Sequence, residues 1–319
     1  MSDNTKQKVI VLIGPTAVGK TNTSIQLAKR FDAEIISGDS MQIYRGMDIG
    51  TAKIKEEEMQ GVPHHLIDIK DPEDSFSTAE FQKLVREKIS DIHSRGRIPM
   101  IVGGTGLYIQ SVLYDYQFTD APGNPEYRSI LEKQVKDDGI EPLYEQLKRI
   151  DPEAAGNIHP NNVRRVIRAL EIFHSSGKTM TDYQEKQTHD LLYDAAIIGL
   201  SMDRQTLYDR INKRVDLMIE EGLLDEVKTL FDKGVKDVQS VQAIGYKEMY
   251  QYLEGNVSLE RASEQLKQNS RRYAKRQLTW FRNKMDVTWF DLTDVNNQGK
   301  IINEISEFIA GKLQLKSNK

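Results

Sequence analysis

The sequence contains no cysteine among its 319 residues. Disulfide bonds and thiolate metal sites are therefore excluded, which fits a reducing compartment. The chain also lacks an apolar run long enough to span a membrane, and residues 1–8 are polar, without the apolar core of a signal peptide. We therefore expect a soluble, cytoplasmic protein that does not associate with membranes.

The chain also lacks a large excess of charge of either sign. Its 44 basic and 48 acidic residues give a net charge of −4, so the whole chain carries no signal for a polyanionic partner. Residues 261–284 are an exception, because eight basic residues stand there against one acidic residue, a local charge of +7. Tyr273, Trp280 and Phe281 interleave with these charges. This composition is typical of a nucleic-acid-binding helix, but also of a solvated basic face over an aromatic core stripe.

A glycine-rich loop follows the first apolar run of the chain. Residues 14–21 match the pattern G-x-x-x-x-G-K-T, between a strand-like run at 8–13 and a helix-like pattern at 20–31. This is the context that a phosphate-binding P-loop requires, since its N–H groups and the helix N-terminus face the anion. Lys20 adds a positive charge, and the Thr21 hydroxyl can ligate Mg²⁺. The residues predicted to bind a di- or triphosphate are Gly14, Pro15, Thr16, Ala17, Val18, Gly19, Lys20 and Thr21.

Short apolar runs alternate with helical patterns over much of the chain, which indicates a parallel α/β sheet flanked by helices. Strands are predicted at residues 8–13, 33–37, 65–69, 98–102, 195–200 and 287–290. Helices are predicted between and after them at 20–31, 76–93, 106–114, 204–221, 223–233, 258–284 and 301–313. We therefore predict a P-loop NTPase-like fold.

Residues 118–193 interrupt this alternation. They show only helical patterns, at 127–136, 143–149 and 163–173, which indicates an all-helical insertion domain. Residues 1–117 and 194–319 would then form the P-loop α/β catalytic core.

Two polar residues follow predicted strands at the edge where such sheets bind ligands. Asp39 comes after the second strand, where a carboxylate can orient or deprotonate a nucleophile, although aspartate also caps turns. Thr105 comes after the fourth strand and could hydrogen-bond a phosphate or leaving oxygen, cap the next helix, or do both. That fourth strand ends without a carboxylate, which argues against a motor or a switch GTPase.

Three arginines fall on the predicted helix at 204–221. Arg210 and Arg214 lie one turn apart on the same face, and Arg204 precedes them. Arginines placed in this way could close over bound phosphates. Pairing with Asp203 or Asp209 on a solvated face is the alternative.

A second basic cluster, residues 161–165 with Arg168, begins a predicted helix inside the insertion. A helix N-terminus with arginines is a favourable contact for phosphate. Together with residues 261–284, it is a second place where a nucleic-acid backbone could bind.

Five sequence blocks, in order, resemble those of the tRNA dimethylallyltransferases, also called tRNA isopentenyltransferases. The blocks are residues 14–21, 39–53 (DSMQIYRGMDIGTAK), 62–68 (VPHHLID), 103–108 (GGTGLY) and 274–282 (AKRQLTWFR). The resemblance covers nearly the whole chain and is to the bacterial form, because a cysteine-based C-terminal zinc finger is absent. Ile54 departs from the family pattern, where proline commonly follows Thr-Ala-Lys, and we expect no catalytic consequence.

The resemblance implies that a dimethylallyl group moves from dimethylallyl diphosphate to the exocyclic N6 amine of the adenosine 3′-adjacent to the tRNA anticodon, with release of diphosphate. The P-loop would hold the diphosphate of the allyl donor. Mg²⁺ on Thr21, Lys20 and the loop amides would stabilise the leaving group. The resemblance makes Asp39 the base, with Thr105 beside it and Lys20 completing the catalytic set, and has Arg214 contact the diphosphate.

The resemblance also implies a tRNA anticodon stem-loop as partner. The target adenine must leave its stack, and single-stranded loops are where proteins read RNA sequence. The residues implied to contact tRNA are Asp39, Ser40, Met41, Gln42, Thr105, Arg128, Asn161, Asn162, Val163, Arg164, Arg165, Gln242, Gly245, Arg271, Arg272, Lys275 and Arg276. A monomer is expected.

An ATP-dependent small-molecule kinase is the main alternative. It would share the P-loop and the carboxylate after the second strand, but would need neither a helical insertion nor a +7 segment. A P-loop RNA-binding protein without turnover is the third possibility. Transfer of a prenyl group, of a phosphoryl group, or of neither would distinguish the three.

Overall fold

The computed structural model of the protein describes residues 6–118, 124–185 and 190–317. The chain divides into two compact units, one formed by Met1–Leu113 with Leu191–Lys319 and the other by Tyr114–Asp190. The sequence patterns place these boundaries a few residues later, at 117/118 and 193/194.

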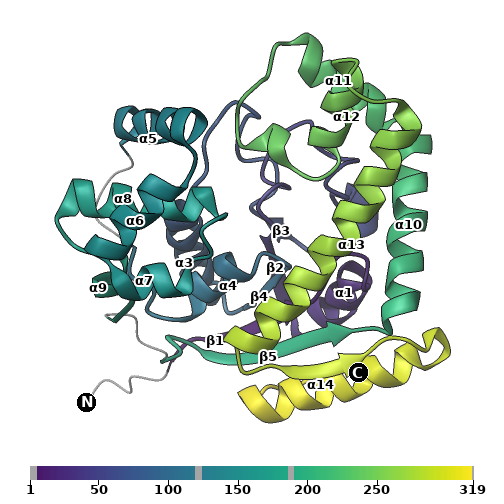
Figure 1. The fold of residues 1–319 in the computed structure, drawn as a ribbon. Coiled ribbons are helices and arrows are strands. Elements are labelled where there is room, and N and C mark those ends of the chain that lie inside the picture. Colours follow the sequence, from purple (N-terminus) through teal and green to yellow (C-terminus); the bar gives the residue numbers. More distant parts are fainter. Residues whose placement is uncertain (1–5, 119–123, 186–189, 318–319) are drawn as a thin grey trace. The chain divides into compact units, whose positions relative to one another are not determined.

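The first unit is built on a six-stranded sheet in which every neighbouring pair is parallel (Figure 1). The strand order is β3-β2-β4-β1-β5-β6. The strands are β1 (Lys8–Ile13), β2 (Ala33–Gly38), β3 (His64–His65), β4 (Ile98–Gly103), β5 (Asp194–Ser201) and β6 (Thr288–Asp291). The inner strands are nearly continuous apolar runs because helices cover both of their faces. The predicted α/β class with a parallel sheet is confirmed.

The helices of this unit agree with the predicted ones to within a few residues at each end, except that α12 and the single-turn α2 were not predicted. They are α1 (Lys20–Phe31), α2 (Glu56–Met59), α3 (Thr78–Ser94), α4 (Gly106–Leu113), α10 (Arg204–Glu220), α11 (Leu223–Asp232), α12 (Tyr246–Leu253), α13 (Leu259–Lys284) and α14 (Gln298–Leu313). Two short 3₁₀ turns, η1 (Ser240–Gln242) and η2 (Val295–Asn297), complete the unit. None of the described helices is long and apolar enough to cross a membrane.

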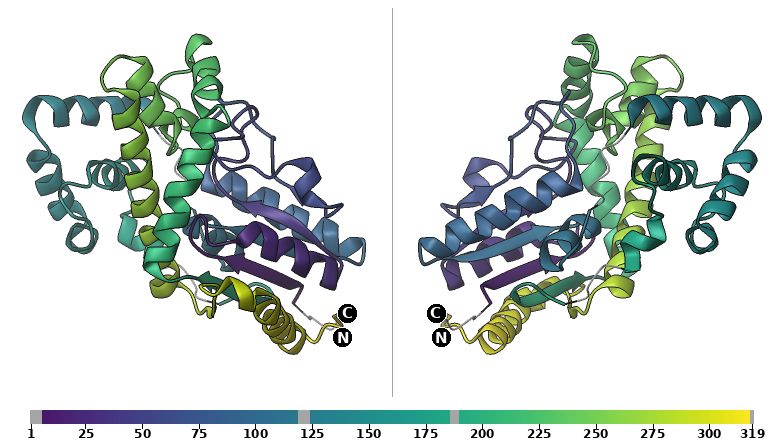
Figure 2. Two further views of the ribbon diagram at one scale, coloured as in Figure 1. Left: turned by 90° about the vertical axis from the view of Figure 1, so that its right-hand side faces the viewer. Right: turned by 90° about the vertical axis from the view of Figure 1, so that its left-hand side faces the viewer.

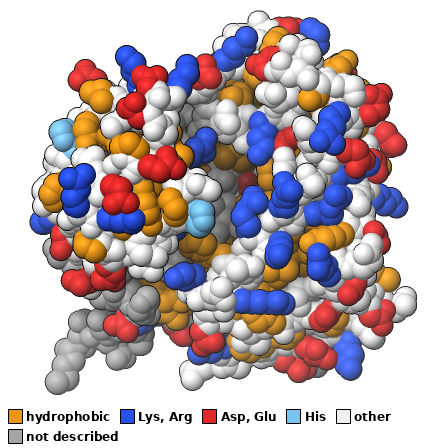
Figure 3. Space-filling view, viewed as in Figure 1, with side chains coloured by type: hydrophobic (Ala, Val, Ile, Leu, Met, Phe, Trp, Pro, Cys, Tyr) orange, Lys and Arg blue, Asp and Glu red, His pale blue; other side chains and the backbone are white. Residues whose placement is uncertain are grey.

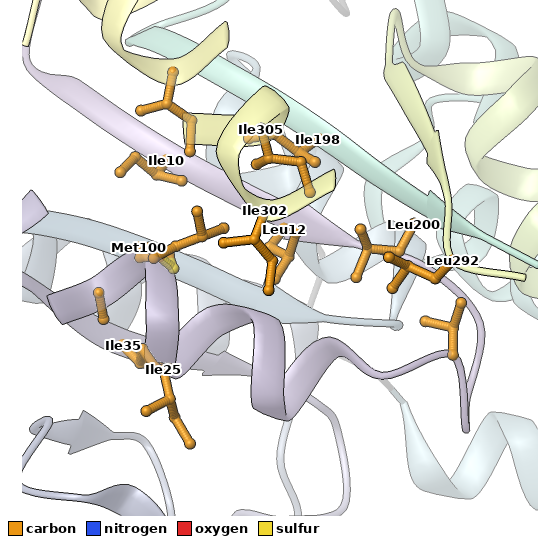
Figure 4. Close-up of a cluster of buried hydrophobic side chains, with 14 of the residues drawn as sticks. Ile10, Leu12, Ile25, Ile35, Met100, Ile198, Leu200, Leu292, Ile302 and Ile305 are labelled. Carbon is orange, nitrogen blue, oxygen red and sulfur yellow. The ribbon is translucent and has the colours of Figure 1, made fainter. Parts of the chain in front are cut away.

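Helices α1 and α14 cover one face of the sheet with a shared apolar core (Figure 4). Ile10 and Leu12 of β1 meet Ile25 of α1 and Ile302 of α14 in this cluster. Successive strand residues point to opposite faces, so Val11 faces the side on which α3 packs. Each fully buried side chain of this kind contributes about 1.5–3 kcal/mol, and the core thereby holds the strand ends in place.

The predicted strand at residues 65–69 is wrong. Strand β3 contains only His64 and His65, since Leu66 (φ 62°) and Asp68 (φ 54°) adopt the left-handed conformation. That conformation ends an extended run, although the apolar pattern of the sequence continues through it.

The described part of the second unit forms helices and contains no strand of the sheet. The helices are α5 (Pro125–Asp138), α6 (Glu141–Ile150), α7 (Pro152–Asn157), α8 (Val163–Ser176) and α9 (Met180–Glu185). Leu143 and Leu147 of α6 pack with Val166 and Leu170 of α8 in a core of their own. Helices α7 and α9 were not predicted, because six residues are too few to show a helical period.

A buried carboxylate joins β2 and β3 to the turn before β4. Glu34 is buried, and Arg95 donates to both of its carboxylate oxygens. Arg97 donates to Oε1 at 3.1 Å, and Nε2 of His65 lies 2.6 Å from Oε2. The Arg95 hydrogen bonds are the largest cause that lowers the pKa of Glu34 to about 2.

We expect Glu34→Gln to destabilise the first unit in a pH-dependent way. The folded pKa of Glu34 lies below its ordinary value of 4.5, so the carboxylate stabilises the fold above pH 4.5 and loses this effect as the pH falls toward 2. The shift corresponds to a contribution on the order of 3 kcal/mol at neutral pH. Urea unfolding of the variant and the wild type between pH 7 and pH 3 measures the difference. The exposed Glu57→Gln serves as control. If the difference in free energy of unfolding between the wild type and Glu34→Gln does not become smaller at low pH, the ionised Glu34 carboxylate is not the stabilising group.

Candidate active site

The glycine-rich loop between β1 and α1 has the backbone that its glycines permit. Gly14 has φ 154°, and a Cβ atom there would lie 2.7 Å from the carbonyl oxygen of Leu200. Gly19 has φ 110°, and Ala17 between them is also left-handed at φ 64°. Helix α1 begins at Lys20, so its unpaired N–H groups and its positive dipole end border the loop. The loop therefore has the chemistry of an anion site.

The Lys20 ammonium folds back over this loop. Its Nζ donates to the carbonyl oxygens of Gly14 (2.9 Å) and Pro15 (2.7 Å). Burial lowers the pKa of Lys20 to about 7, the positive charge of Arg214 acts in the same direction, and the Asp39 carboxylate opposes them. An anion in the loop would relieve this cost by favouring the ammonium form.

Three neighbouring strands end together beside the loop. In the sheet register, Ile13 of β1 and Gly38 of β2 both pair with Gly103 of β4. The backbones of Gly38 and Gly103 approach so closely that a Cβ atom on Gly103 would clash with Gly38. The N–H group of Thr105 donates to the Gly38 carbonyl oxygen at 3.4 Å. The structure therefore places the P-loop, Asp39 and Thr105 along one edge of the sheet.

Asp39 does cap a turn, and it also faces Lys20. Its Oδ1 accepts the N–H groups of Met41 (2.8 Å) and Gln42 (3.4 Å). Burial raises the pKa of Asp39 above its ordinary value, while these two N–H groups and the Lys20 charge oppose the rise. Both described hydrogen bonds use Oδ1, so Oδ2 remains available to accept a proton.

The Thr105 hydroxyl forms no hydrogen bond of good geometry with the described part of the chain. Its Oγ1 is buried and makes no hydrogen bond there, so it does not cap α4, although the Thr105 carbonyl oxygen accepts the Ile109 N–H group at 3.2 Å. Tyr273 of α13 lies close to it: burial, helped by the Asp39 charge, raises the pKa of Tyr273 to about 12, and the nearby Thr105 and Gln277 side chains oppose the rise. A buried hydroxyl without a partner is costly. Thr105 is therefore suited to bond an atom of a bound molecule.

Arg210 and Arg214 of α10 are half-buried and face the loop. Burial, and next the charge of Arg210, lower the pKa of Arg214. Asp203 instead accepts N–H groups at the start of α10, and Asp209 accepts the side chain of Gln205. Among the described residues neither guanidinium has an acidic partner, so the ion-pairing alternative is wrong for these two arginines.

A cavity of about 330 Å³ opens where these elements meet. Its polar end is formed by Thr16, Asp39 and Arg214, with Ser40, Met41 and Gln42 following Asp39 in the chain. Five apolar side chains form an apolar wall of the same cavity: Ile211, Val215, Met218, Ala243 and Leu266. The arrangement suits a molecule with an anionic end and a small apolar body.

Two further pockets border the same residues. Thr21 and Arg214 line one of about 530 Å³, and Ser40 and Thr105 line another of about 570 Å³. Several predicted site residues of the first unit, among them Asp39, Thr105 and Arg214, thus line adjoining pockets.

Glu226 of α11 was not singled out from the sequence, yet it holds one wall of the cavity. Its carboxylate accepts the N–H groups of residues 48–50 at 2.8–3.0 Å and the hydroxyl of Tyr246. Gln42 donates to the carbonyl oxygen of Thr51 at 3.2 Å in the same loop. No local pattern distinguishes Glu226 from an ordinary exposed helix acid, because its backbone partners lie about 177 positions away.

The basic residues of α13 fall into two groups. Arg272, Lys275 and Arg276 are exposed, and Lys and Arg side chains gather over this helix (Figure 3). Arg271 is half-buried and donates to Asn212 of α10, the helix that runs beside α13 (Figure 2). The structure therefore leaves Arg272 and Lys275 open to a partner, places the Arg276 guanidinium over the Tyr273 ring at the cavity, and ties Arg271 to the fold.

Two other residues predicted to contact tRNA lie near the cavity, just before α12. Gln242 ends η1 and lines the cavity. Gly245, at φ 102°, donates its N–H group to Glu248 at 2.7 Å. A left-handed backbone there favours glycine, so Gly245 has a structural reason for its identity.

The second unit contains the remaining predicted residues. Arg128 donates to the buried Glu171 carboxylate through two nitrogens, at 3.1 and 2.7 Å. Asn162 caps α8 by accepting the Arg165 N–H group at 3.4 Å. Asn161, Arg164 and Arg165 are exposed around the start of α8, with Val163 half-buried between them.

These features define a P-loop α/β protein in which an anion cradle and a half-buried carboxylate face one partly apolar cavity. The model of the IPP transferase family matches residues 42–284, and the chain belongs to this family.

Known relatives extend the match to the whole chain. The chain is 66% identical to the tRNA dimethylallyltransferase of Bacillus subtilis strain 168, over 98% of this chain and 100% of that protein. The crystal structure of the full-length tRNA isopentenylpyrophosphate transferase of Bacillus halodurans matches with a TM-score of 0.74 and 60% identity, over 97% of both chains. A eukaryotic dimethylallyltransferase acting on tRNA matches with a TM-score of 0.83 and 32% identity, over 98% of this chain and 81% of that one. These matches do not favour the kinase alternative.

We expect binding of a diphosphate to draw a proton onto Lys20. At pH 8 this amine is mostly neutral in the free protein, because its pKa is about 7, and a bound anion raises that pKa. Titration calorimetry with a short alkyl diphosphate, in buffers of different ionisation enthalpy, should show uptake of up to about one proton at pH 8 and much less at pH 6. Lys20→Met is the control that removes the titrating group. If Lys20→Met takes up as many protons as the wild type on binding the diphosphate, a group other than Lys20 is protonated.

Proposed function

We propose that the protein transfers a dimethylallyl group from dimethylallyl diphosphate to the N6 amine of the adenosine 3′-adjacent to the tRNA anticodon, and releases diphosphate. The observation that carries this proposal is the cavity itself. The P-loop supplies an anion cradle, Asp39 supplies a base, and apolar side chains of α10 and α13 line the same cavity. The names of the relatives support the same reaction.

The donor would bind with its diphosphate in the P-loop and its allyl group against the apolar wall. Loop N–H groups, Lys20 and Arg214 would stabilise the charge that develops on the leaving oxygen. The Thr21 hydroxyl fits a Mg²⁺ ion, because it is exposed at the first turn of α1 beside Arg214, and Mg²⁺ takes oxygen ligands mainly from phosphates and water. When bound, the ion would neutralise part of the diphosphate charge.

The acceptor amine would enter from the side of Asp39 and Thr105. The amine nitrogen forms a bond to the allyl carbon as the carbon–oxygen bond to diphosphate breaks, and the amine proton moves to Oδ2 of Asp39. Burial raises the pKa of Asp39, which makes its carboxylate a stronger proton acceptor. The unpaired Thr105 hydroxyl would bond near the same centre, and the apolar wall would keep water from the allyl group.

The exposed basic residues would hold the RNA through its phosphates. We assign this role to Arg272, Lys275 and Arg276 in the first unit and to Arg164 and Arg165 at the start of α8 in the insertion domain. Ser40 and Gln42, which follow Asp39, would contact the flipped adenine. We propose that the protein acts as a monomer in the cytoplasm.

We expect purified protein with Mg²⁺ to incorporate radiolabelled dimethylallyl into unmodified tRNA. Thin-layer analysis of the digested RNA would locate the label on one adenosine of the anticodon loop. Phosphoryl transfer from ATP without prenyl incorporation would instead favour the kinase. Binding of tRNA with neither activity would favour an RNA-binding protein without turnover.

We expect Asp39→Asn to lower kcat by about 10²- to 10⁴-fold, because the amide keeps the shape of the turn cap but cannot take the proton. The Kd for tRNA should change by less than about threefold, the mark of a group that acts in the chemical step. Rapid-quench rates and filter binding measure the two effects. The exposed Asp209→Asn on α10 is the matched control, and equal losses of rate and binding in Asp39→Asn would make Asp39 a structural cap.

A further inference from the structure

One buried amide of α13 connects the donor and acceptor sides of the site. Gln277 is 6% exposed, and its Oε1 accepts the N–H group of Thr16 in the P-loop at 2.9 Å. Its Nε2 donates to the carbonyl oxygen of Gly104, directly before Thr105, at 3.0 Å. A single side chain thus joins two loops that lie 173 and 261 positions away in the sequence.

Helix α13 reaches this place because glycines make room for it. A Cβ atom on Gly104 would clash with Nε2 of Gln277, and a Cβ atom on Gly106 would clash with the Trp280 ring. Neither glycine has a positive φ, so the close approach of α13, and not backbone freedom, explains them. Residues 103–106 therefore form the surface on which α13 packs, as well as the end of β4.

Beyond the ends of the strands, no ladder holds these loops together. The register of β1 and β4 ends at the pair Ile13 and Gly103, and the Gln277 amide makes the next connection. The side-chain amide accepts from one backbone and donates to the other. An ionised carboxylate lacks the donor, and a thioether has no donor and is only a weak acceptor.

We propose that Gln277 is a positioning residue for prenyl transfer, whose amide sets the spacing between the diphosphate cradle at Thr16 and the hydroxyl of Thr105. This inference rests on the function proposed above. Reacting atoms must approach within about 3–3.5 Å, and a displacement of about 1 Å can lower the rate roughly 100-fold. Gln277 is not among the residues that line the cavity, so it acts through the two loops and not on the substrate.

The buried and exposed faces of α13 allow the two effects of a substitution to be separated. Gln277 points to the loops, whereas Lys275 and Arg276 next to it are exposed. A change confined to the Gln277 amide therefore leaves the basic surface in place. Loss of positioning should appear in the rate of the chemical step and not in RNA affinity.

The test compares Gln277→Met, which removes both hydrogen bonds at similar volume, with Gln277→Glu, which keeps only the ability to accept from Thr16. Both should fold, as shown by circular dichroism and thermal melting. Their single-turnover rates of prenyl transfer should fall about 10- to 100-fold, while the Kd for tRNA and the KM for the donor change by less than about threefold. Gln268→Met, an exposed change on the same helix, is the matched control.

A double-mutant cycle with Thr105→Val distinguishes positioning from general destabilisation. If Gln277 acts through Thr105, the double variant should be less than about threefold slower than the slower single variant. Rate losses that multiply, a wild-type rate in folded Gln277→Met, or failure of both Gln277 variants to fold would overturn the inference. A wild-type protein that transfers no prenyl group would overturn the proposed function itself.

Discussion

Parallel pairing of β2, β4 and β1 brings three loops to one edge of the sheet, and every feature of the site depends on that convergence. Gly103 is the register partner of both Ile13 and Gly38, so the segments that follow these residues leave the sheet side by side. Glycine on both β2 and β4 permits the close approach. A parallel sheet has all its carboxyl ends at the same edge, which is why an anion loop, a carboxylate and a hydroxyl can face one cavity.

Burial then changes the chemistry of the groups at this edge. Desolvation disfavours the charged forms of both Lys20 and Asp39, and each charge partly offsets the cost of the other. Arg214 adds a second unpaired positive charge on the same side. Such a site favours an anionic ligand and stabilises the negative charge that develops on a leaving group. This agrees with release of diphosphate. The unpaired hydroxyl of Thr105 gives the opposite side a group that a substrate can satisfy.

Local sequence was sufficient for features that depend on neighbouring residues. The sequence alone predicts the P-loop, the alternation of strands and helices, and the positions of Asp39 and Thr105 after their strands. The predicted strand at 65–69 failed because its apolar pattern contains two left-handed residues, Leu66 and Asp68, that no periodicity reveals. Arg271 and Arg128 resemble free basic residues in sequence, but one is bonded to Asn212 and the other to buried Glu171.

The sequence by itself determined the class of fold and the anion loop, because strand alternation and the glycine spacing are encoded within short segments. Only the tertiary structure revealed Glu226 and Gln277, each of which binds backbone groups more than 170 positions away. Backbone N–H and carbonyl groups are the same at every position, so no residue pattern marks which of them a distant side chain will meet. The spacing between the donor and acceptor loops is therefore a property of how α13 packs on the strand ends.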